Sequence, residues 1–471
     1  MDRRQFMKTL AQGAAVAAAS RALPGGIMPG GAPAEAALPS RMTLAAVGDC
    51  IVTRKISHRR DPDFLALAEL LRGVDCAWGN CELVFADSRQ VYPALKGGDP
   101  HVMAPAWGAD ELAWMGIDFV GVANNHVLDF GNEGMFSTLE NLDRVGIAHA
   151  GAGADLAAAA SPGYVDTPAG RVGQVNCAST FPRFFQAGPA HPYLKGRPGL
   201  NPVRLNRKFQ LDRKLFEEMK KVEHTFDDLQ GYNEFPFPPD QLPPKGEWYF
   251  GERQTIAADR PGLLSTAVPG DLTRVTDAIK VARNNSRLVV ASIHAHEARH
   301  KLEIADPFLQ PFARACIDAG ADVFFAAGPH VIRGIEIYKG KPIFYCLSNF
   351  IFQYETSHPV PAEDFESNGL DPRTLDPSLF GGKIFYHEQK RFWQSFVPRI
   401  TYEGNKVTEI EIYPVSLGFG QPLYERGFPL LARGDLGREI LEDIAARSKP
   451  HGTTMTIEDG VGRVVLGDKA A

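Results

Sequence analysis

Short apolar runs that alternate with helical stretches constrain this chain more than any other feature of its sequence. The pattern begins with an apolar run at Thr43–Val47, a helical stretch at Asp63–Leu71 and a second run at Asp75–Glu82. It returns later with apolar runs at Leu288–Ile293 and Val323–Ala327. Alternation of this kind is typical of domains in which helices cover the faces of a sheet. We therefore predict a layered α/β fold.

Two stretches interrupt the alternation and divide the chain. From about 181 to 262 Pro and Gly cluster, and one amphipathic helix at Leu211–Val222 stands among them. We interpret this stretch as a loop-rich insertion over one face of the sheet. A second loop-rich stretch opens a C-terminal extension near 353–471. The prediction is one main domain over 41–471 that carries both segments.

The first forty residues are predicted to be an export signal. Arg3-Arg4, followed by Phe6 and Lys8, resembles a twin-arginine signal, and the apolar stretch from 10 to 19 is too short to span a bilayer. Residues 34–36 have the small-x-small pattern of a signal-peptidase site. We expect export by the twin-arginine route after folding, a periplasmic or extracellular location, and no transmembrane helix in the mature chain.

Composition limits the partners and the redox chemistry. With 50 Lys and Arg against 56 Asp and Glu, the net charge is −6, which argues against a nucleic-acid partner. Six cysteines in an exported chain permit a disulfide. Most of them lie in apolar, strand-like runs, so buried thiols are the favoured interpretation. The six are Cys50, Cys76, Cys81, Cys177, Cys316 and Cys346.

Side chains that bind metals gather where the predicted strands end. They are Asp49, Asn80, Glu82, Asn125, His126, His294, His296 and His330. In open α/β sheets, ligands bind at the carboxyl ends of the strands, so these residues could converge on one point. Carboxylate, amide and imidazole ligands together suit a divalent Mn, Fe or Zn ion. We predict a site for one or two such ions.

Each of these residues also has a purely structural interpretation. Asp49 after Gly48 fits a turn, and Asn125 with its neighbours fits a loop in which Asn side chains cap the backbone. His294 and His296 are more specific, because alternate residues of an extended segment share a face and could meet one ion. The metal hypothesis therefore rests on the whole set.

Several motifs together resemble the bacterial capsule-synthesis CapA family, which is associated with poly-γ-glutamate capsules. The resemblance covers roughly Thr43 to Phe352. The motifs are Val47-Gly48-Asp49, Gly79-Asn80-Cys81-Glu82, Ala123-Asn124-Asn125-His126 with Asp129, Gly151-Ala152-Gly153, Gly328-Pro329-His330-Val331 and Ser348-Asn349-Phe350. This family is similar to the calcineurin-like metallophosphoesterases, which implies a sandwich of two mixed β-sheets flanked by helices.

The resemblance also implies roles for individual residues. Asp49 would be the first-strand metal ligand, and Asn80 or Glu82 the second-strand ligand. Asn125 would bind metal, and His126 would act on the leaving group as the catalytic acid or base. The two later ligands would be His294 and His330.

The chain departs from the related patterns at four places. Asn80 stands where phosphoesterases carry the Asp of a second-strand Gly-Asp motif. Ile51 stands where phosphoesterases carry the His of Asp-x-His. Gly328 stands where the family has the first His of His-Pro-His, and Ala295-His296 replaces an aromatic residue and Gly. His296 is thus the candidate to replace a lost ligand.

Two functions fit this sequence. The first is an exported metal-dependent hydrolase that acts on an envelope or capsule-related ester, phosphoester or amide. The second is a non-catalytic component of poly-γ-glutamate or capsule polymer synthesis or export, with capsule-synthesis membrane proteins as partners. Arg54, in a basic turn that also fits a solvated surface, and Lys96 are candidates to bind an anionic polymer or a small anionic substrate.

Overall fold

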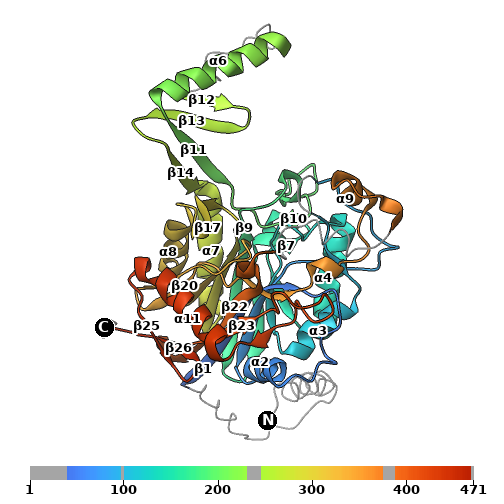
Figure 1. Ribbon diagram of the computed structural model, residues 1–471, viewed down its shortest axis with the longest axis vertical. Coiled ribbons are helices and arrows are strands. Elements are labelled where there is room, and N and C mark those ends of the chain that lie inside the picture. Colours follow the sequence, from blue (N-terminus) through green and yellow to red (C-terminus); the bar gives the residue numbers. More distant parts are fainter. Residues whose placement is uncertain (1–39, 97–99, 231–245, 375–387, 468–471) are drawn as a thin grey trace, which may run out of the picture.

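Two β-sheets packed face to face form the body of the protein. The structure is a computed structural model that describes residues 40–96, 100–230, 246–374 and 388–467 (Figure 1). In the larger sheet, the strands lie in the order β25 (Met455–Glu458), β26 (Val461–Val464), β23 (Lys406–Ser416), β22 (Gln394–Glu403), β1 (Arg41–Ile51), β2 (Cys76–Cys81), β5 (Phe119–Gly121) and β6 (Ala148–Ala150). β21 (Asn349–Phe352) also pairs with β1, and β24 (Leu430–Leu431) pairs with β23.

The second sheet supplies the other half of the sandwich. Its order is β19 (Ile335–Tyr338), β20 (Lys341–Phe344), β18 (Val323–Ala327), β15 (Leu288–His294), β9 (Gly170–Ala178) and β8 (Gly163–Thr167). Between the sheets, Leu44 and Trp78 pack with Val290 and Phe325 in one buried cluster. The rings of Trp78 and Phe325 stack with centroids 5.0 Å apart. Both sheets are mixed, because parallel and antiparallel pairs occur in each.

Helices cover the outer face of each sheet. The helices on the larger sheet are α2 (Pro62–Arg72), α3 (Trp107–Met115) and α4 (Gly131–Val145). The helices on the second sheet are α7 (Pro269–Asn285) and α8 (Leu309–Asp318), and α11 (Gly434–Ser448) packs on β23. Because both faces of β1 are buried, its sequence is almost continuously apolar. The predicted sandwich of mixed sheets flanked by helices is confirmed.

The stretch from 205 to 267, which we call the arm, is not a set of loops over the sheet. Its four-stranded sheet has the order β12 (Glu247–Phe250), β13 (Arg253–Ala258), β11 (Leu205–Asp212) and β14 (Gly262–Ala267), and α6 (Arg213–Gln230) packs on it. Figure 1 shows the arm standing away from the body. The predicted helix at Leu211–Val222 is therefore displaced, since β11 runs to Asp212 and α6 continues to Gln230.

Several other expectations can be compared with the structure. All six cysteines are buried free thiols, as expected. Within the described residues, no helix is both long and apolar enough to cross a membrane. In the C-terminal extension, β22 pairs directly with β1 and so belongs to the main sheet. The predicted export signal at 1–40 lies, apart from Ser40, outside the described residues.

Candidate metal centre

Asp49 lies at the end of β1, where the strand passes very close to Ser348. The Asp49 backbone N–H donates to the Ser348 carbonyl over 3.0 Å. A Cβ atom on Gly48 would lie 1.8 Å from that same oxygen, so glycine is needed for this approach. Ser348 itself has a left-handed φ of 63°. Strained backbone of this kind is often found at functional sites. The Asp49 side chain is fully buried as a result.

The end of β2 brings a second carboxylate to the same point. Glu82 is fully buried, and its Oε1 lies 3.5 Å from His294 Nε2 and 3.9 Å from His330 Nε2. Asn80 has a different place, because its Nδ2 donates to Asp49 Oδ1 over 2.8 Å and lies 3.2 Å from His294 Nδ1. A carboxylate only accepts hydrogen bonds, so it orients the NH₂ group of Asn80 toward itself. In this arrangement Asn80 positions Asp49 and His294.

Two imidazoles follow from the end of β15. His294 is the last residue of that strand, and its Nε2 lies 2.9 Å from His296 Nε2. Burial, together with the neighbouring imidazoles, lowers the pKa of both side chains well below the ordinary value for histidine. Both rings are therefore neutral at pH 7, which is the form of histidine that binds metals.

His330 is oriented by an amide. Asn349 donates from Nδ2 to the Phe392 carbonyl over 2.9 Å, so its Oδ1 faces His330 Nδ1 at 2.8 Å and accepts from it. His330 Nδ1 also lies 3.2 Å from Asp49 Oδ2. These contacts place the proton on Nδ1 and leave the lone pair of Nε2 on the side of Glu82. A bound metal commonly depends on such outer contacts to fix the tautomer of its histidines.

His296 occupies the space that a side chain at position 328 would need. A Cβ atom on Gly328 would lie 2.8 Å from His296 Cδ2 and 3.2 Å from His294 Nε2. Gly328 also has a φ of 122°, which a residue with a side chain rarely adopts. The His296 ring therefore lies in the cluster beside His294, at the place of the ligand that Gly328 does not supply.

These side chains form two overlapping groups that could hold metal ions. Asp49, Glu82 and His330 form one group and Glu82, His294 and His296 the other, with the ligand atoms of each within 4.8 Å of one another. Ligand atoms on a single ion lie roughly 3–4 Å apart when metal–ligand bonds are about 2.0–2.3 Å long. Two buried carboxylates would cost several kcal/mol without a compensating charge, so a divalent cation fits this donor set.

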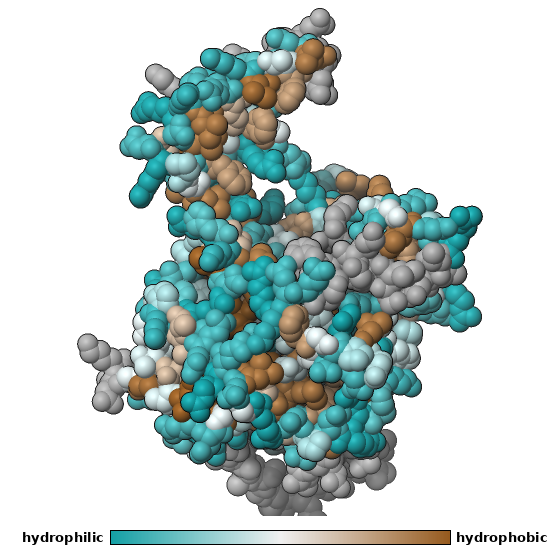
Figure 2. Space-filling view, in the orientation of Figure 1, coloured by the Kyte–Doolittle hydropathy of each residue, from teal (hydrophilic) through white to brown (hydrophobic). Residues whose placement is uncertain are grey.

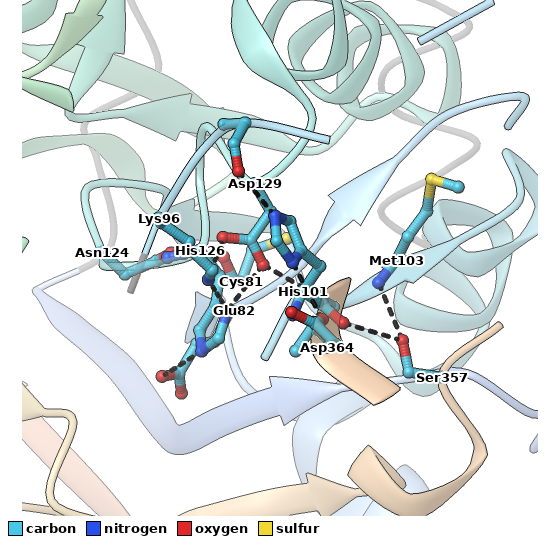
Figure 3. Close-up of polar contacts among 12 residues, drawn as sticks. Cys81, Glu82, Lys96, His101, Met103, Asn124, His126, Asp129, Ser357 and Asp364 are labelled. Atoms are coloured by element: carbon cyan, nitrogen blue, oxygen red, sulfur yellow. Dashed lines mark hydrogen bonds and ion pairs between the residues drawn. The ribbon is translucent and has the colours of Figure 1, made fainter. Parts of the chain in front are cut away.

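His126 faces the cluster from the loop between β5 and α4. Its Nδ1 donates to Asp129 Oδ2 over 2.7 Å, and its Nε2 lies 3.9 Å from Glu82 Oε1. Lys96 pairs with Asp129 Oδ1, and its Nζ lies 3.4 Å from His126 Nδ1 (Figure 3). Burial would raise the pKa of Asp129, but Lys96 and His126 outweigh burial and lower that pKa. The ionised Asp129 thus holds the proton of His126 on Nδ1, which leaves Nε2 available on the side of Glu82.

Asn124 and the other predicted residues are buried or half-buried. Asn124 accepts from the His126 N–H over 3.0 Å and donates to the Cys81 carbonyl over 2.7 Å, so it fixes the loop. Asn125, which stands between Asn124 and His126 in the sequence, is also buried, with 2% of its surface exposed. Arg54 packs 4.7 Å from the Phe428 ring centroid, and burial lowers its pKa to about 10. Lys96, also predicted to bind substrate, has a side chain that is only 1% exposed.

The sequence interpretation did not assign two residues that the structure places next to the site. Asp129 accepts the proton of His126, and Asn349 orients His330. Asp129 lies three residues after His126, a spacing that could have suggested the contact. Asn349 belongs to a motif that was recognised, but its partner Phe392 lies 43 residues away in sequence.

Comparison with known proteins identifies the family. Residues 43–354 match the family described as bacterial capsule synthesis protein PGA_cap. The chain belongs to this family. It is 33% identical over 446 residues to the uncharacterized protein y4sH of Sinorhizobium fredii. This match covers 90% of this chain and 93% of that protein.

Two named relatives match over shorter stretches. The chain is 34% identical over 94 residues to the capsule biosynthesis protein CapA of Bacillus anthracis, or 20% of this chain and 22% of that protein. It is 27% identical over 267 residues to a probable polyglutamine synthesis accessory protein of Mycobacterium tuberculosis, or 56% of this chain and 48% of that protein. The PGA_cap match confirms the resemblance to CapA proteins and connects the chain with a capsule-related function. The matched range contains every candidate metal ligand.

Proposed function

We propose that this PGA_cap protein is an exported, metal-dependent hydrolase of an envelope or capsule-related substrate. The observation that carries the proposal is the convergence of two buried carboxylates and three imidazoles beside His126. These five side chains come from strand ends far apart in sequence, and a purely structural role would not need so many ionisable groups in one buried place. Asp49, Glu82, His294, His296 and His330 would hold one or two divalent ions, with Mn, Fe and Zn as the candidates.

The chain's own residues define what chemistry is available. A divalent ion in this site supplies Lewis-acid activation of an ester, phosphoester or amide and of water. His126 Nε2 is placed to take or give a proton, because Asp129 fixes the proton on Nδ1. Asn80 and Asn349 hold the orientations of Asp49, His294 and His330. Asn124 keeps the His126 loop against the end of β2.

A second candidate function is binding without turnover. The Mycobacterium tuberculosis relative is named as a probable polyglutamine synthesis accessory protein, which favours a component that holds a polymer or a partner. On this alternative the same site would bind polymer carboxylates through its metal, and capsule-synthesis membrane proteins would be the partners. Export by the twin-arginine route is part of both proposals, since the motif at Arg3-Arg4 is independent of the site.

A comparison of the wild type with His126→Gln tests the catalytic proposal. We expect purified wild-type protein to contain Mn, Fe or Zn and to hydrolyse a member of a panel of esters, phosphoesters and γ-glutamyl amides. Loss of a general acid or base typically lowers kcat by about 100- to 10,000-fold. His126→Gln should show that loss and keep its metal, because His126 lies outside both ligand groups. Metal-loaded wild type that binds γ-glutamyl polymer and cleaves none of the panel would support the second candidate function.

A further inference from the structure

The outer side of α6 is apolar and exposed, although the rest of the helix is highly charged. The four residues Leu215, Val222, Phe226 and Leu229, which we call the α6 stripe, are 45%, 44%, 50% and 80% exposed. Their spacings of seven, four and three residues put them on one narrow side of a helix. Figure 2 shows apolar surface on the arm, well away from the body. Such a stripe is typical of helices that pack against another helix.

A different side of α6 already has its partner within the arm. Phe216 is 3% exposed, and the His224 ring lies 5.1 Å from the Trp248 ring. Thr255 Oγ1 lies 3.6 Å from Met219 Sδ, so this side rests on β12 and β13. The described strands of the arm therefore leave about half of the surface of Leu215, Val222 and Phe226 exposed, and more of that of Leu229.

We propose that the α6 stripe pairs with the α6 stripe of a second copy of this chain, with the two helices antiparallel. Three of its four residues are symmetric, because Leu215 and Leu229 each lie seven residues from Val222, whereas Phe226 has Glu218 at its mirror position. An isologous twofold contact requires that symmetry, since each residue meets its mirror position on the other copy. Val222 would then lie on the axis, with Leu215 of one copy against Leu229 of the other.

The charges of α6 favour this partner and this direction. The first half of the helix contains Arg213, Lys214, Lys220 and Lys221 against Glu217 and Glu218, a net charge of +2, and the second half contains Glu223, Asp227 and Asp228, a net charge of −3. An antiparallel pair brings the basic half of each copy beside the acidic half of the other. With the axis at Val222, Asp228 of one copy lies two residues, or about 3 Å along the helix, from the position that faces Lys214 of the other, which is within reach of a lysine side chain. A parallel pair would place like charges together instead.

Cysteine crosslinking of the full-length protein tests both the pairing and its direction. The six native cysteines are buried, so an added surface thiol reacts with little background. Val222→Cys should form an intermolecular disulfide readily under oxidation, because the two thiols would meet on the axis. Leu229→Cys alone should not, since its two copies would be about 21 Å apart along an antiparallel pair. A mixture of Leu215→Cys and Leu229→Cys should crosslink. Efficient self-crosslinking of Leu229→Cys would overturn the antiparallel arrangement.

Sedimentation velocity over about 1–200 μM protein measures the association itself. We expect a concentration-dependent dimer, at least tenfold weaker in Val222→Lys and weaker in Lys214→Asp. The double variant Lys214→Asp with Asp228→Lys should recover the dimer. Leu264→Lys, which changes another exposed apolar residue of the arm, is the matched control and should dimerise normally. A wild type that stays monomeric over this range would overturn the proposal, as would a monomer that binds lipid vesicles through the stripe.

Discussion

The body and the arm place their polar and apolar side chains in opposite ways. In the body, Asp49, Glu82, His294 and His330 are buried at strand ends beside the half-buried His296, although ionised groups are expensive to bury. In the arm, by contrast, the apolar α6 stripe is exposed beside exposed charged residues such as Lys214 and Asp228. Burial of polar groups indicates a chemical site, and exposure of apolar groups indicates a docking surface. The two regions therefore suggest separate tasks for one chain.

Removal of a candidate ligand from the body should have the largest effect. His294→Ala deletes an imidazole that touches Glu82, His296 and Asn80. We expect metal affinity to fall by at least about 100-fold, since even outer contacts of metal sites are worth 10- to 100-fold. Metal per chain after dialysis, followed by chelator competition, measures the loss.

His101→Ala is the matched control for that experiment. His101 is also a buried imidazole, bonded to Asp364 and to the Ala94 carbonyl, but it belongs to neither ligand group. It should lose stability and keep its metal. Equal metal contents in His294→Ala and wild type would remove the basis for the site.

A glycine from each region gives the next comparison. Gly328→Ala puts a Cβ 2.8 Å from the His296 ring at a φ of 122°, so we expect about 2–4 kcal/mol of destabilisation and weaker metal binding. Gly251→Ala, in the arm, has a φ of 54° and meets no atom within 4 Å. It should cost about 1–2 kcal/mol through the backbone alone and leave metal binding unchanged. Urea unfolding of the two metal-free variants measures the difference in their free energies of unfolding. Similar losses of stability in Gly328→Ala and Gly251→Ala would show that His296 moves aside freely.

The metal centre could be predicted from sequence more fully than the arm, for a physical reason. A polar residue directly after a buried apolar strand, such as Asp49 or His294, must lie at the end of that strand. The sheet order then brings such ends together. By contrast, β11 contains Arg207 and Lys208 and is only half buried, so its sequence has no clear apolar period. The orientation of His330 also lay beyond sequence reasoning, because it depends on the carbonyl of Phe392.

The junction between the body and the arm should become less stable at acid pH. At the base of the arm, the buried Asp271 accepts from the Arg204 N–H and from its Nε and Nη2. Burial would raise the pKa of Asp271, but Arg204 and Arg274 outweigh burial and lower that pKa. Its stabilising contribution is therefore present above the ordinary carboxyl pKa of about 3.9 and is lost as the pH falls further.

Asp271→Asn should remove part of that acid dependence and loosen the base of the arm. We expect a loss of about 1–3 kcal/mol, the usual size for hydrogen bonds to a charged group. Amide exchange in β11 and β14 at neutral pH, with thermal melts between about pH 5 and 3, measures both effects. Asp277→Asn changes an exposed carboxylate on the same helix and is the control. Unchanged exchange in Asp271→Asn would mean that other contacts hold the arm.

The smallest effect should come from changing one region while the other is measured. Val222→Lys alters a side chain that is 44% exposed and lies far from the body, so its thermal stability should stay within about 0.5 kcal/mol of wild type at protein concentrations where both are monomeric. Its metal content should be identical to that of wild type. In the reverse direction, Asp49→Ala should lose metal and still form the dimer expected of the wild type, because β1 lies in the main sheet and α6 packs on the separate sheet of the arm. Joint loss of metal and of association in either variant would contradict this separation and would show that the dimer contact and the metal centre depend on each other.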